Sequence, residues 1–372
     1  MVVNYNVLGL IFASMHDTSI AELTKQRTMG SILFGGRYRL IDFPLSNMVN
    51  SGIAEVGVIT KSNYGSLLDH LGSGREWDLS RKKGGLHLLP PYSQDGGIYR
   101  GRLDALSNVW SFIEHSSAKY VILSDCDMVT TIDFNPVIEQ HIESEADITV
   151  VYSKGLYNVE KNHSTNILEL DGNRVKDVLV DPQFSGECNI SLGMFVMSKE
   201  FLKKIVSESI SRNQYSLIRD VLQAKKNEYT ICGYEHKGYF SKIDSLLNFY
   251  NANLELLKPE NRNALFKKDF PVYTKIGDNG PTKYGLESDI SNSLIADGCI
   301  IEGTVENCVL FRGVKIGKDT VIKNSVILQG TEIGEGCRVS SVITDKNVKI
   351  SNGKVLTGSD TYPLFIGKNA QI

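Results

Sequence analysis

The chain has 372 residues, of which 41% are hydrophobic and 22% are charged, and its formal net charge is −3 at neutral pH. This length exceeds one ordinary hydrophobic core, so two domains are expected, and the composition excludes disordered and fibrous proteins. The small net charge and the lack of a long run of Lys or Arg give no indication of nucleic-acid or membrane binding.

The six cysteines are scattered along the chain and form no Cys-x-x-Cys pair. This pattern argues against a zinc site and against a disulfide framework. The first residues lack a basic region before the apolar run and are too few to span a bilayer, so neither a signal peptide nor a membrane anchor is predicted. A cytoplasmic protein is therefore expected.

Up to about residue 258, short β-rich runs alternate with amphipathic stretches. In chain order these segments are residues 7–13, 53–60, 64–71, 102–115, 119–124, 136–144 and 146–152. Strand and helix at this spacing predict right-handed crossovers and a mostly parallel sheet. Because ligands on such sheets lie beyond the carboxyl ends of the strands, chemistry is expected just after Ala13, Thr60 and Ser124.

A helix at residues 245–257 is predicted to end this half, and prolines and glycines then mark an extended connector at residues 259–288. From residue 289 to 372 small aliphatic residues recur every six positions, in two ladders: Val321, Ile327, Ile333, Val339; and Ile316, Ile322, Leu328. The Ile-Gly phrases at 316 and 333 also repeat after seventeen residues. This short period predicts a parallel β-helix. The alternative, an antiparallel sandwich, would alternate every second residue.

Several motifs resemble bacterial ADP-glucose pyrophosphorylase, also called glucose-1-phosphate adenylyltransferase. They are FGGRYRLIDFPLSN at 34–47, NSGI at 50–53, VGVIT at 56–60, Tyr99-Arg-Gly-x-x-Asp-Ala105, YVILS at 120–124 with Asp127, and Ser191-Leu-Gly193. The resemblance covers essentially the whole chain. It implies an α/β, Rossmann-like nucleotidyltransferase domain with a mostly parallel mixed sheet at 1–258, then a left-handed parallel β-helix of hexapeptide repeats at 289–372. The family makes ADP-glucose and pyrophosphate from ATP and glucose 1-phosphate for glycogen or starch.

Nucleotidyl transfer brings several negative charges together, so such a site depends on positive charge, metal and positioning. The family supplies a loop of the form Gly-Gly-x-Gly-x-Arg-Leu, whose backbone N–H groups approach the phosphates. Here residues 14–20 read SMHDTSI. Ser19 stands at the Arg position, Asp17 places a carboxylate where phosphate should lie, and Met29 with Gly30 replaces a Lys-Pro pair. The loop is therefore predicted to be an ordinary packed surface loop.

The family also uses two aspartates that hold Mg²⁺ between the substrate phosphates, as hard oxygen ligands should. Asp127 matches one of them, whereas Lys242 stands at the other within Tyr239-Phe-Ser-Lys-Ile-Asp-Ser245. An ammonium in place of a carboxylate reverses the charge of the site. We predict that Lys242 pairs directly with Asp127 in the metal's place. No cofactor is expected, and Mg²⁺ would bind only if the chain were an active enzyme.

A third family feature is a lysine in a Glu-Lys-Pro motif that grips the sugar phosphate. Asp181 stands at that position in Val180-Asp181-Pro182, and STN at 164–166 replaces a sugar-facing Phe-Gly-Val. An anion facing an anion should repel glucose 1-phosphate. No complete catalytic set remains, so catalysis is predicted to be lost.

Other family positions are retained. Tyr99, Asp104 and Ser191 match the substrate pocket, for which structural roles are favoured. Arg27 and Arg39, with Arg37 between them, match basic positions that bind anionic regulators at the domain junction. A solvated basic rim or an interface salt bridge is the favoured interpretation of these arginines. The histidines show no metal-ligand spacing, and His16 is interpreted as incidental.

The pattern resembles a GlgD-type chain, which lacks the metal and loop residues and modulates a GlgC-type catalytic subunit. The resemblance implies a heterotetramer with that subunit as partner, and no nucleic-acid or membrane partner. Three alternatives stay open. The chain could be an active pyrophosphorylase in which Lys242, Arg102 and Asp125 stand in for lost groups, a glycosyltransferase that uses the Asp125-Cys-Asp127 pair, or a sensor of sugar phosphate or nucleotide.

Overall fold

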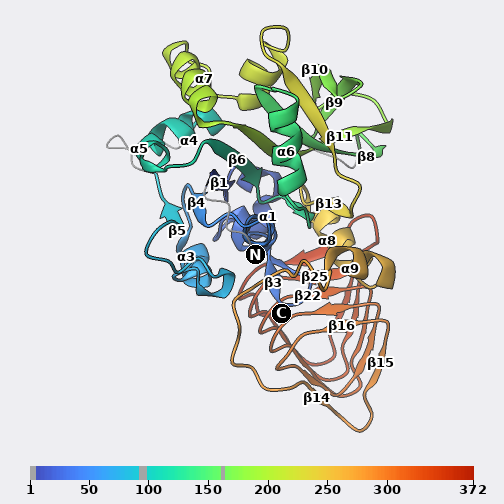
Figure 1. The fold of residues 1–372 in the computed structure, drawn as a ribbon. Helices are drawn as coiled ribbons and strands as arrows, with labels where there is room; N and C mark the ends of the chain where they lie inside the picture. The colour runs from blue at the N-terminus through green and yellow to red at the C-terminus, as the bar shows by residue number, and fades with distance from the viewer. Residues whose placement is uncertain (1–5, 92–98, 161–163) are drawn as a thin grey trace.

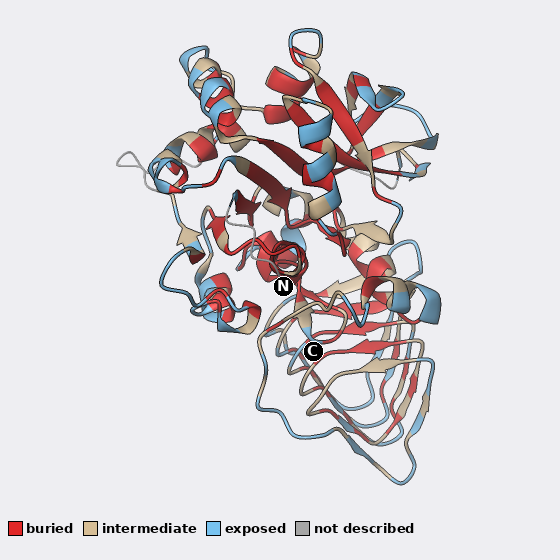
Figure 2. Cartoon of the chain, in the orientation of Figure 1, coloured by how far each residue is buried: buried red, intermediate tan, exposed pale blue. Residues whose placement is uncertain are grey.

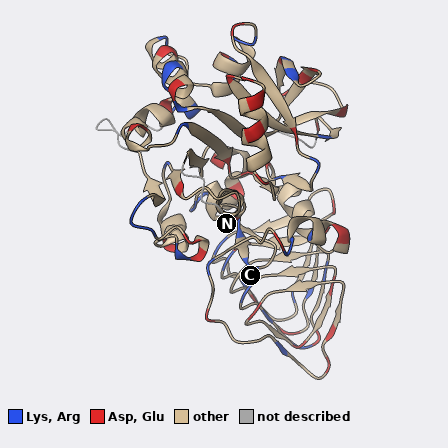
Figure 3. Cartoon of the chain, viewed as in Figure 1, with Lys and Arg blue, Asp and Glu red and all other residues tan. Residues whose placement is uncertain are grey.

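The computed structural model describes residues 6–91, 99–160 and 164–372. The chain forms an α/β domain followed by a β-helix, and Figure 1 shows helices α8 and α9 where the two domains meet. The predicted fold class is confirmed. Among the described residues no helix is both long and apolar enough to cross a membrane. Figure 3 shows Lys and Arg interspersed with Asp and Glu over both domains.

The α/β domain is built on a nine-stranded sheet with the order β5-β4-β1-β6-β11-β8-β12-β10-β9. Strand β1 pairs in parallel with β4 and β6, whereas β11 pairs antiparallel with β6 and β8, so the sheet is mixed. The four strands predicted at residues 7–13, 53–60, 119–124 and 146–152 are all present, and five strands that were not predicted complete the sheet. Their bounds are β1 (Val7–Phe12), β4 (Glu55–Ile59), β5 (Gly85–Leu89), β6 (Tyr120–Asp125), β8 (Ile148–Tyr157), β9 (Asn166–Asp171), β10 (Arg174–Val180), β11 (Gly186–Ser198) and β12 (Ile231–Glu235).

Some helices of this domain cover the two faces of the sheet, and others lie toward the β-helix. The helices are α1 (Ala21–Thr24), α2 (Asp42–Asn50), α3 (Gly65–Leu71), α4 (Arg102–Asn108), α5 (Trp110–His115), α6 (Asn135–Glu143), α7 (Lys199–Ser211), α8 (Leu246–Glu255) and α9 (Pro259–Leu265). The prediction of a single helix at residues 102–115 is wrong in one respect, because the structure has two helices there, α4 and α5. They meet at Val109, whose φ of −100° and ψ of 12° lie outside helical values. Helix α8 begins where the Ser245 side chain accepts a hydrogen bond from the Asn248 N–H, a capping contact.

Side chains of β1 show how the sheet divides the core. Leu8, Leu10 and Phe12 belong to the apolar cluster on one face, and Val7 and Ile11 belong to the cluster on the other. Successive strand residues point to opposite faces, so a continuous apolar run is needed when both faces are covered. Figure 2 shows the central strands as the most buried part of the domain.

The β-helix consists of three five-stranded parallel sheets, one for each side of the coil. Their strands are, for the first, β14 (Lys283–Tyr284), β17 (Ile300–Ile301), β20 (Lys315–Ile316), β23 (Glu332–Ile333) and β26 (Lys349–Ile350); for the second, β15 (Asp289–Ser291), β18 (Thr304–Glu306), β21 (Val321–Lys323), β24 (Arg338–Ser340) and β27 (Val355–Thr357); for the third, β16 (Leu294–Ile295), β19 (Val309–Leu310), β22 (Val326–Ile327), β25 (Val342–Thr344) and β28 (Leu364–Ile366).

Ile316 lies directly beneath Ile333 in the next coil, which explains the seventeen-residue repeat. One ladder residue was assigned wrongly: Val321 is only half-buried and stacks with Thr304 and Arg338, whereas its neighbour Ile322 is buried in the coil. Val321 and Ile322 point to opposite faces of the strand, because successive strand residues alternate. Counting every six residues assumes eighteen residues a coil, but this coil has seventeen, so the count cannot tell which of the two faces inward. The segment 259–288 contains helix α9 and also β14, the first strand of the β-helix.

The two domains share one apolar cluster. Phe249, Tyr250 and Leu256 of the α8 region pack with Val309 and Val326 of the third β-helix sheet. The outer face of that sheet is therefore apolar, unlike the outer faces of an isolated coil. This contact fixes α8 between the β-helix and the α/β domain.

Candidate functional site

The residues that follow β1, β4 and β6 come together at the carboxyl end of the sheet, as predicted. Ala13 N donates to Ile59 O at 2.9 Å, which joins the ends of β1 and β4, and Phe12 pairs with Asp125 at the end of β6. Opposite Asp125, β11 has a register shift between Ser191 and Met194. Gly193 within that shift has φ of +68°, and a Cβ there would lie 2.9 Å from Asp125 Oδ2. Glycine therefore lets the Asp125 carboxylate lie against the strand.

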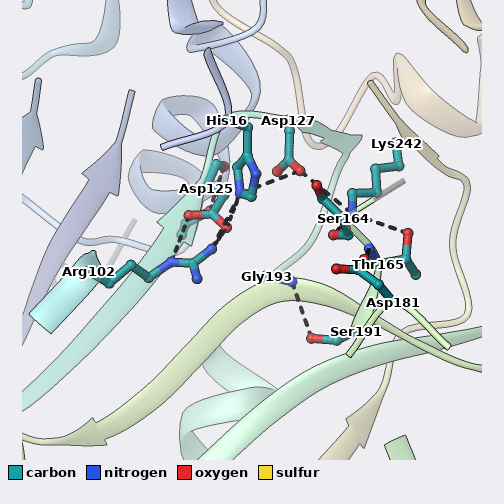
Figure 4. Close-up of polar contacts among 11 residues, drawn as sticks. His16, Arg102, Asp125, Asp127, Ser164, Thr165, Asp181, Ser191, Gly193 and Lys242 are labelled. Carbon is teal, nitrogen blue, oxygen red and sulfur yellow. Dashed lines mark hydrogen bonds and ion pairs between the residues drawn. The ribbon is translucent and has the colours of Figure 1, made fainter. Parts of the chain in front are cut away.

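His16 lies between the two carboxylates of the Asp125-Cys-Asp127 segment (Figure 4). Its Nε2 is 3.2 Å from Asp125 Oδ2 and 3.7 Å from Asp127 Oδ2. The interpretation of His16 as incidental was therefore wrong. The imidazole comes from the altered loop after β1, so the loop itself contacts the acidic residues of β6.

Arg102, the first residue of α4, approaches Asp125 from the other side (Figure 4). Its Nε donates to Asp125 Oδ1 at 3.2 Å, and its Nη2 donates to Asp125 Oδ2. The Asp125 side chain is 3% exposed and the Arg102 side chain 11% exposed, so this ion pair is shielded from water. A buried carboxylate of this kind requires such partners, because an unpaired charge there would be costly.

The pKa values of these groups follow from their contacts. Burial alone would raise the pKa of Asp125, but the charge of Arg102 and the hydrogen bond with His16 outweigh burial and hold it well below its usual range. For His16, burial lowers the pKa, and the carboxylates of Asp127 and Asp125 more than offset burial, so the pKa lies above its ordinary value. These contacts therefore favour an ionised Asp125 carboxylate beside a protonated His16 imidazole.

Lys242 lies on β13 (Phe240–Lys242), which pairs antiparallel with β7 (Met128–Thr130). Its Nζ is 4.0 Å from Asp127 Oδ2, so the predicted ion pair is confirmed, although at a separation longer than a hydrogen bond. The ammonium donates instead to Ser164 O at 2.5 Å and to Thr165 Oγ1 at 3.3 Å. Lys242 therefore links the STN segment to the acidic pair.

The residues present do not fit the magnesium ion of the family. Mg²⁺ prefers oxygen ligands in octahedral geometry. One ligand atom each from His16, Asp125 and Asp127 lies within 4.8 Å of the others, so the three side chains are close enough to share an ion. Asp125, however, is engaged by a guanidinium, Asp127 faces an ammonium, and an imidazole nitrogen separates the two carboxylates. A dication would have to displace these groups.

The loop after β1 is held by its own acidic side chain. Asp17 Oδ1 accepts a hydrogen bond from the Met29 backbone N–H at 2.7 Å, and Met29 is buried. Burial raises the pKa of Asp17 to about 6, against the hydrogen bond from Met29 and the charge of Lys61. Ser19 lies in a short 3-10 helix and its N–H donates to His16 O at 3.0 Å. The segment is a packed, hydrogen-bonded turn in place of an open glycine loop.

Asp181 does not point freely toward a sugar phosphate. Its Oδ1 accepts from the Thr165 N–H at 2.9 Å, and its own N–H donates to Thr165 O at 3.0 Å. The residue has φ of +49°, a left-handed conformation that Asp tolerates better than most residues. Asp181 thus continues the β9–β10 pairing by one residue and holds Thr165, whose hydroxyl accepts from Lys242.

The three retained pocket residues have the following contacts. Tyr99 is buried, and its hydroxyl has no hydrogen-bond partner within the described part of the chain. Asp104, in the first turn of α4, accepts from Arg100 N at 3.0 Å and from Arg100 Nε at 3.2 Å, and these bonds tie the residue before the helix to its start. Ser191 Oγ accepts from Gly193 N at 3.5 Å inside the β11 register shift. The contacts of Asp104 and Ser191 serve local backbone conformation.

The three arginines predicted at the domain junction make different contacts. Arg27 forms two hydrogen bonds with Asp345 of the β-helix, at 2.8 and 2.9 Å, and both side chains are buried. Arg39 donates to Ser66 O at 2.6 Å, and exposed Arg37 lies over the Tyr38 ring at 5.5 Å from its centroid. Arg27 is therefore the interface salt bridge that the sequence interpretation favoured.

Arg37 and Arg39 also line a pocket of about 190 Å³ between the domains, together with Lys275 and Arg312. Nearby, burial and the charges of Arg39 and Arg27 lower the pKa of Lys346 to about 7. An anion site in this pocket stays a prediction, now without Arg27.

Two site residues were missed or undervalued in the sequence, His16 and Arg102. Their positions in the sequence could have identified them. His16 follows β1 and Arg102 begins the helix beside β6, and both lie next to the carboxyl end of the sheet, where ligands were expected.

Comparison with family models gives two matches. The model described as nucleotidyl transferase matches residues 9–258, and the model described as GlmU-like, C-terminal hexapeptide matches residues 281–362. The first covers more than half of the chain. The two matched regions correspond to the α/β domain and the β-helix.

Individual relatives are similar over most of the chain. The glycogen biosynthesis protein GlgD of Bacillus subtilis (strain 168) is 38% identical over 366 residues, which are 98% of this chain and 96% of that protein. GlgD of Geobacillus stearothermophilus is 37% identical over 86% of this chain and 83% of its own length. The glucose-1-phosphate adenylyltransferase of Clostridium perfringens (strain SM101 / Type A) is 31% identical over the same two shares, 86% and 83%.

Proposed function

Because the chain belongs to the glucose-1-phosphate adenylyltransferase family of nucleotidyl transferases, we propose that it is a non-catalytic subunit acting in glycogen biosynthesis. In this proposal it assembles in the cytoplasm with a GlgC-type catalytic subunit, as a heterotetramer, and modulates that subunit's activity. It uses no cofactor of its own. The similarity to two GlgD proteins supports the assignment to glycogen biosynthesis.

The observation that carries the proposal is the charge balance at the acidic pair. The carboxylates of Asp125 and Asp127 face Arg102, His16 and Lys242, all within 4.0 Å. In an active site, substrate phosphates and metal would have to meet positive charge that is free to interact with them. Here that charge is already neutralised by the protein's own acidic side chains.

A regulatory effect on a catalytic partner then has to pass through a shared interface. A subunit that binds one conformation of its partner better than another shifts the partner's equilibrium, and a coupling free energy of about 1–3 kcal/mol corresponds to roughly 5- to 150-fold. No ligand on this chain is required for such a shift.

The first test is an assay of the purified chain with ATP, glucose 1-phosphate and Mg²⁺. We expect no ADP-glucose above the enzyme-free background. Formation of ADP-glucose at a rate comparable with that of a GlgC-type enzyme would show that the chain is itself a working enzyme, and the proposal would fail.

The second test is co-expression with a GlgC-type subunit from the same source. We expect the two chains to co-purify, and the activity per catalytic subunit to change about 5- to 150-fold relative to that subunit alone at the same concentration. Failure of the chains to associate would contradict the proposed partnership, even if the isolated chain proved inactive.

A further inference from the structure

The first coil of the β-helix has an open side. Its three strands, β14, β15 and β16, are each the end strand of a five-stranded sheet, and within the described residues each pairs only with the next coil. The outer N–H and C=O groups of an end strand are a template for another strand. Coils of this kind bury their apolar residues by stacking, so a terminal coil needs a cover.

The inward-facing position of this coil is exposed, whereas the same position in later coils is buried. Tyr284 stacks with Ile301, which stacks in turn with Ile316. Ile301 is 0% and Ile316 2% exposed, but Tyr284 is 57% exposed. Leu286, at the corner between β14 and β15, is fully exposed. These two side chains and the outer edges of β14, β15 and β16 make up a surface that we call the first-coil end.

The other end of the β-helix is covered on its first sheet by the last residues of the chain. Lys349 N of β26 donates to Ala370 O at 2.9 Å, and Ile372 N donates to Lys349 O at 2.9 Å. A head-to-tail contact between copies would have to displace these residues from β26. Such a contact would also repeat without closing and build an open filament. A contact between two like ends closes after one pairing.

Two copies of the first-coil end are complementary to each other. A two-fold axis through the corner at Leu286 would set β14 of one copy antiparallel to β15 of the other, which is a permitted pairing of strand edges. Leu286 would then meet its own copy at the axis.

The charges beside this corner also match under the same rotation. Lys283 is exposed on the outer side of β14, in a column with Ile300 and Lys315, and Asp289 is exposed on the outer side of β15. Because the rotation lays β14 over β15 of the other copy, each Lys283 ammonium would approach the other copy's Asp289 carboxylate, and two attractive pairs would result. Figure 1 shows β14 in the part of the β-helix farthest from the α/β domain.

We propose that the first-coil end joins two copies of this chain in a two-fold dimer. The occupant is a second copy because the strand edges, the apolar corner and the opposite charges all find their counterparts on the same surface. The contact uses residues of this chain alone, so the proposal holds or fails independently of the proposed catalytic partner.

The first test is sedimentation velocity of the purified full chain over a range of concentrations. We expect the wild type to form a dimer whose fraction rises with concentration. Leu286→Glu would place two carboxylates together at the axis and should weaken association by about tenfold or more. Val355→Glu, at a position on β27 that is 69% exposed, is the matched control and should leave the dimer unchanged.

The second test uses a disulfide to report the geometry. A residue on a two-fold axis lies beside its own copy, and a disulfide forms only when the two Cα atoms come within about 7 Å. Mild oxidation of Leu286→Cys should therefore give a covalent dimer on a non-reducing gel. Val355→Cys and the wild type, in which five of the six cysteines are buried, should give none.

A wild type that stays monomeric at the highest accessible concentration would overturn the proposal. A dimer that persists in Leu286→Glu, with no cross-link in Leu286→Cys, would place the contact elsewhere and would also overturn it. The same holds if the isolated chain is monomeric and Leu286→Glu weakens only its association with a GlgC-type subunit, because the first-coil end would then bind a different partner.

Discussion

Lys242 and Asp127 face each other across the short β13–β7 pair, with Nζ 4.0 Å from Oδ2. The backbone fixes this relationship, because Ile243 N donates to Asp127 O at 2.7 Å and Lys242 pairs with Met128. A side chain placed at position 242 therefore lies beside Asp127 whatever its charge. The identity of this one residue decides whether a positive or a negative charge stands beside Asp127 on this side.

Lys242→Asp is expected to create a magnesium site. The variant replaces an ammonium beside Asp127 by a second carboxylate, and carboxylate oxygens are the ligands that Mg²⁺ accepts. We expect Mg²⁺ to raise the Tm of the variant in a saturable way and to leave the wild type unchanged. Lys242→Ala removes the positive charge without adding a ligand and serves as the control. If the alanine variant responds to Mg²⁺ as strongly, the added carboxylate is not the cause.

Arg27→Ala is expected to destabilise the chain by about 3–5 kcal/mol, because it leaves the buried Asp345 carboxylate without its partner. Urea unfolding at pH 7 measures this change. Lys203→Ala breaks an exposed pair with Glu114 and should change the stability far less, because water screens that pair. Equal losses for the two variants would mean that the Arg27–Asp345 contact is not shielded from water.

Asp17→Asn should make the chain more stable above pH 6. The pKa of Asp17 is raised from 3.8 to about 6 on folding, so the folded state holds the proton more tightly than the unfolded state between those pH values. Stability therefore falls as pH rises through this window, and the loss is complete above pH 6. Partial exposure reduces the effect to about 1–2 kcal/mol.

Asparagine keeps the acceptor for Met29 N but cannot ionise, so the variant should lose this part of the pH dependence. Urea unfolding at about pH 4.5 and pH 8 compares the two proteins. A variant that is less stable than the wild type at both values would indicate that the charge of Asp17 stabilises the loop.

Gly193→Ala should disturb the acidic site as well as the strand. Its φ of +68° disfavours alanine by roughly 1–2 kcal/mol. The new Cβ would also lie 2.9 Å from Asp125 Oδ2, so the carboxylate would have to move away from Arg102 and His16. Gly172→Ala is a matched control, with φ of +61° and nothing within 4 Å of its Cβ.

The difference between the two glycine variants isolates the contact with Asp125. We expect Gly193→Ala to be the more destabilising by about 1 kcal/mol or more in urea unfolding, since it displaces a buried, paired carboxylate. Equal stability of the two variants would show that Asp125 adapts without loss.

The fold could be predicted from the sequence because its signals are local. The strands after which chemistry was expected end within one residue of the predicted positions, and the repeat from Ile316 to Ile333 is one turn of the β-helix. The broken helix at Val109 and the outward-facing Val321 were not predicted, because each depends on one residue's place in a packed structure rather than on a pattern.

The site was predictable only in part. Lys242 opposite Asp127 followed from the motif in which it stands, since the family pattern places both residues at one point. The contact of His16 with residues more than a hundred positions away could not be read from spacing. Asp181 was expected to oppose a phosphate, yet its carboxylate accepts a hydrogen bond from Thr165 N at the end of the β9–β10 pair. A contact between residues sixteen positions apart cannot be read from a motif.

The shared packing of Phe249, Tyr250 and Leu256 against Val309 and Val326 bears on how the chain can be cut. Cleavage of the peptide backbone between α9 and β14 would cut the polypeptide in two but leave this apolar interface between the domains intact. The two fragments should therefore remain associated during gel filtration. If the β-helix were expressed alone, the apolar outer face of its third sheet would be exposed to water, and the fragment should be prone to aggregation.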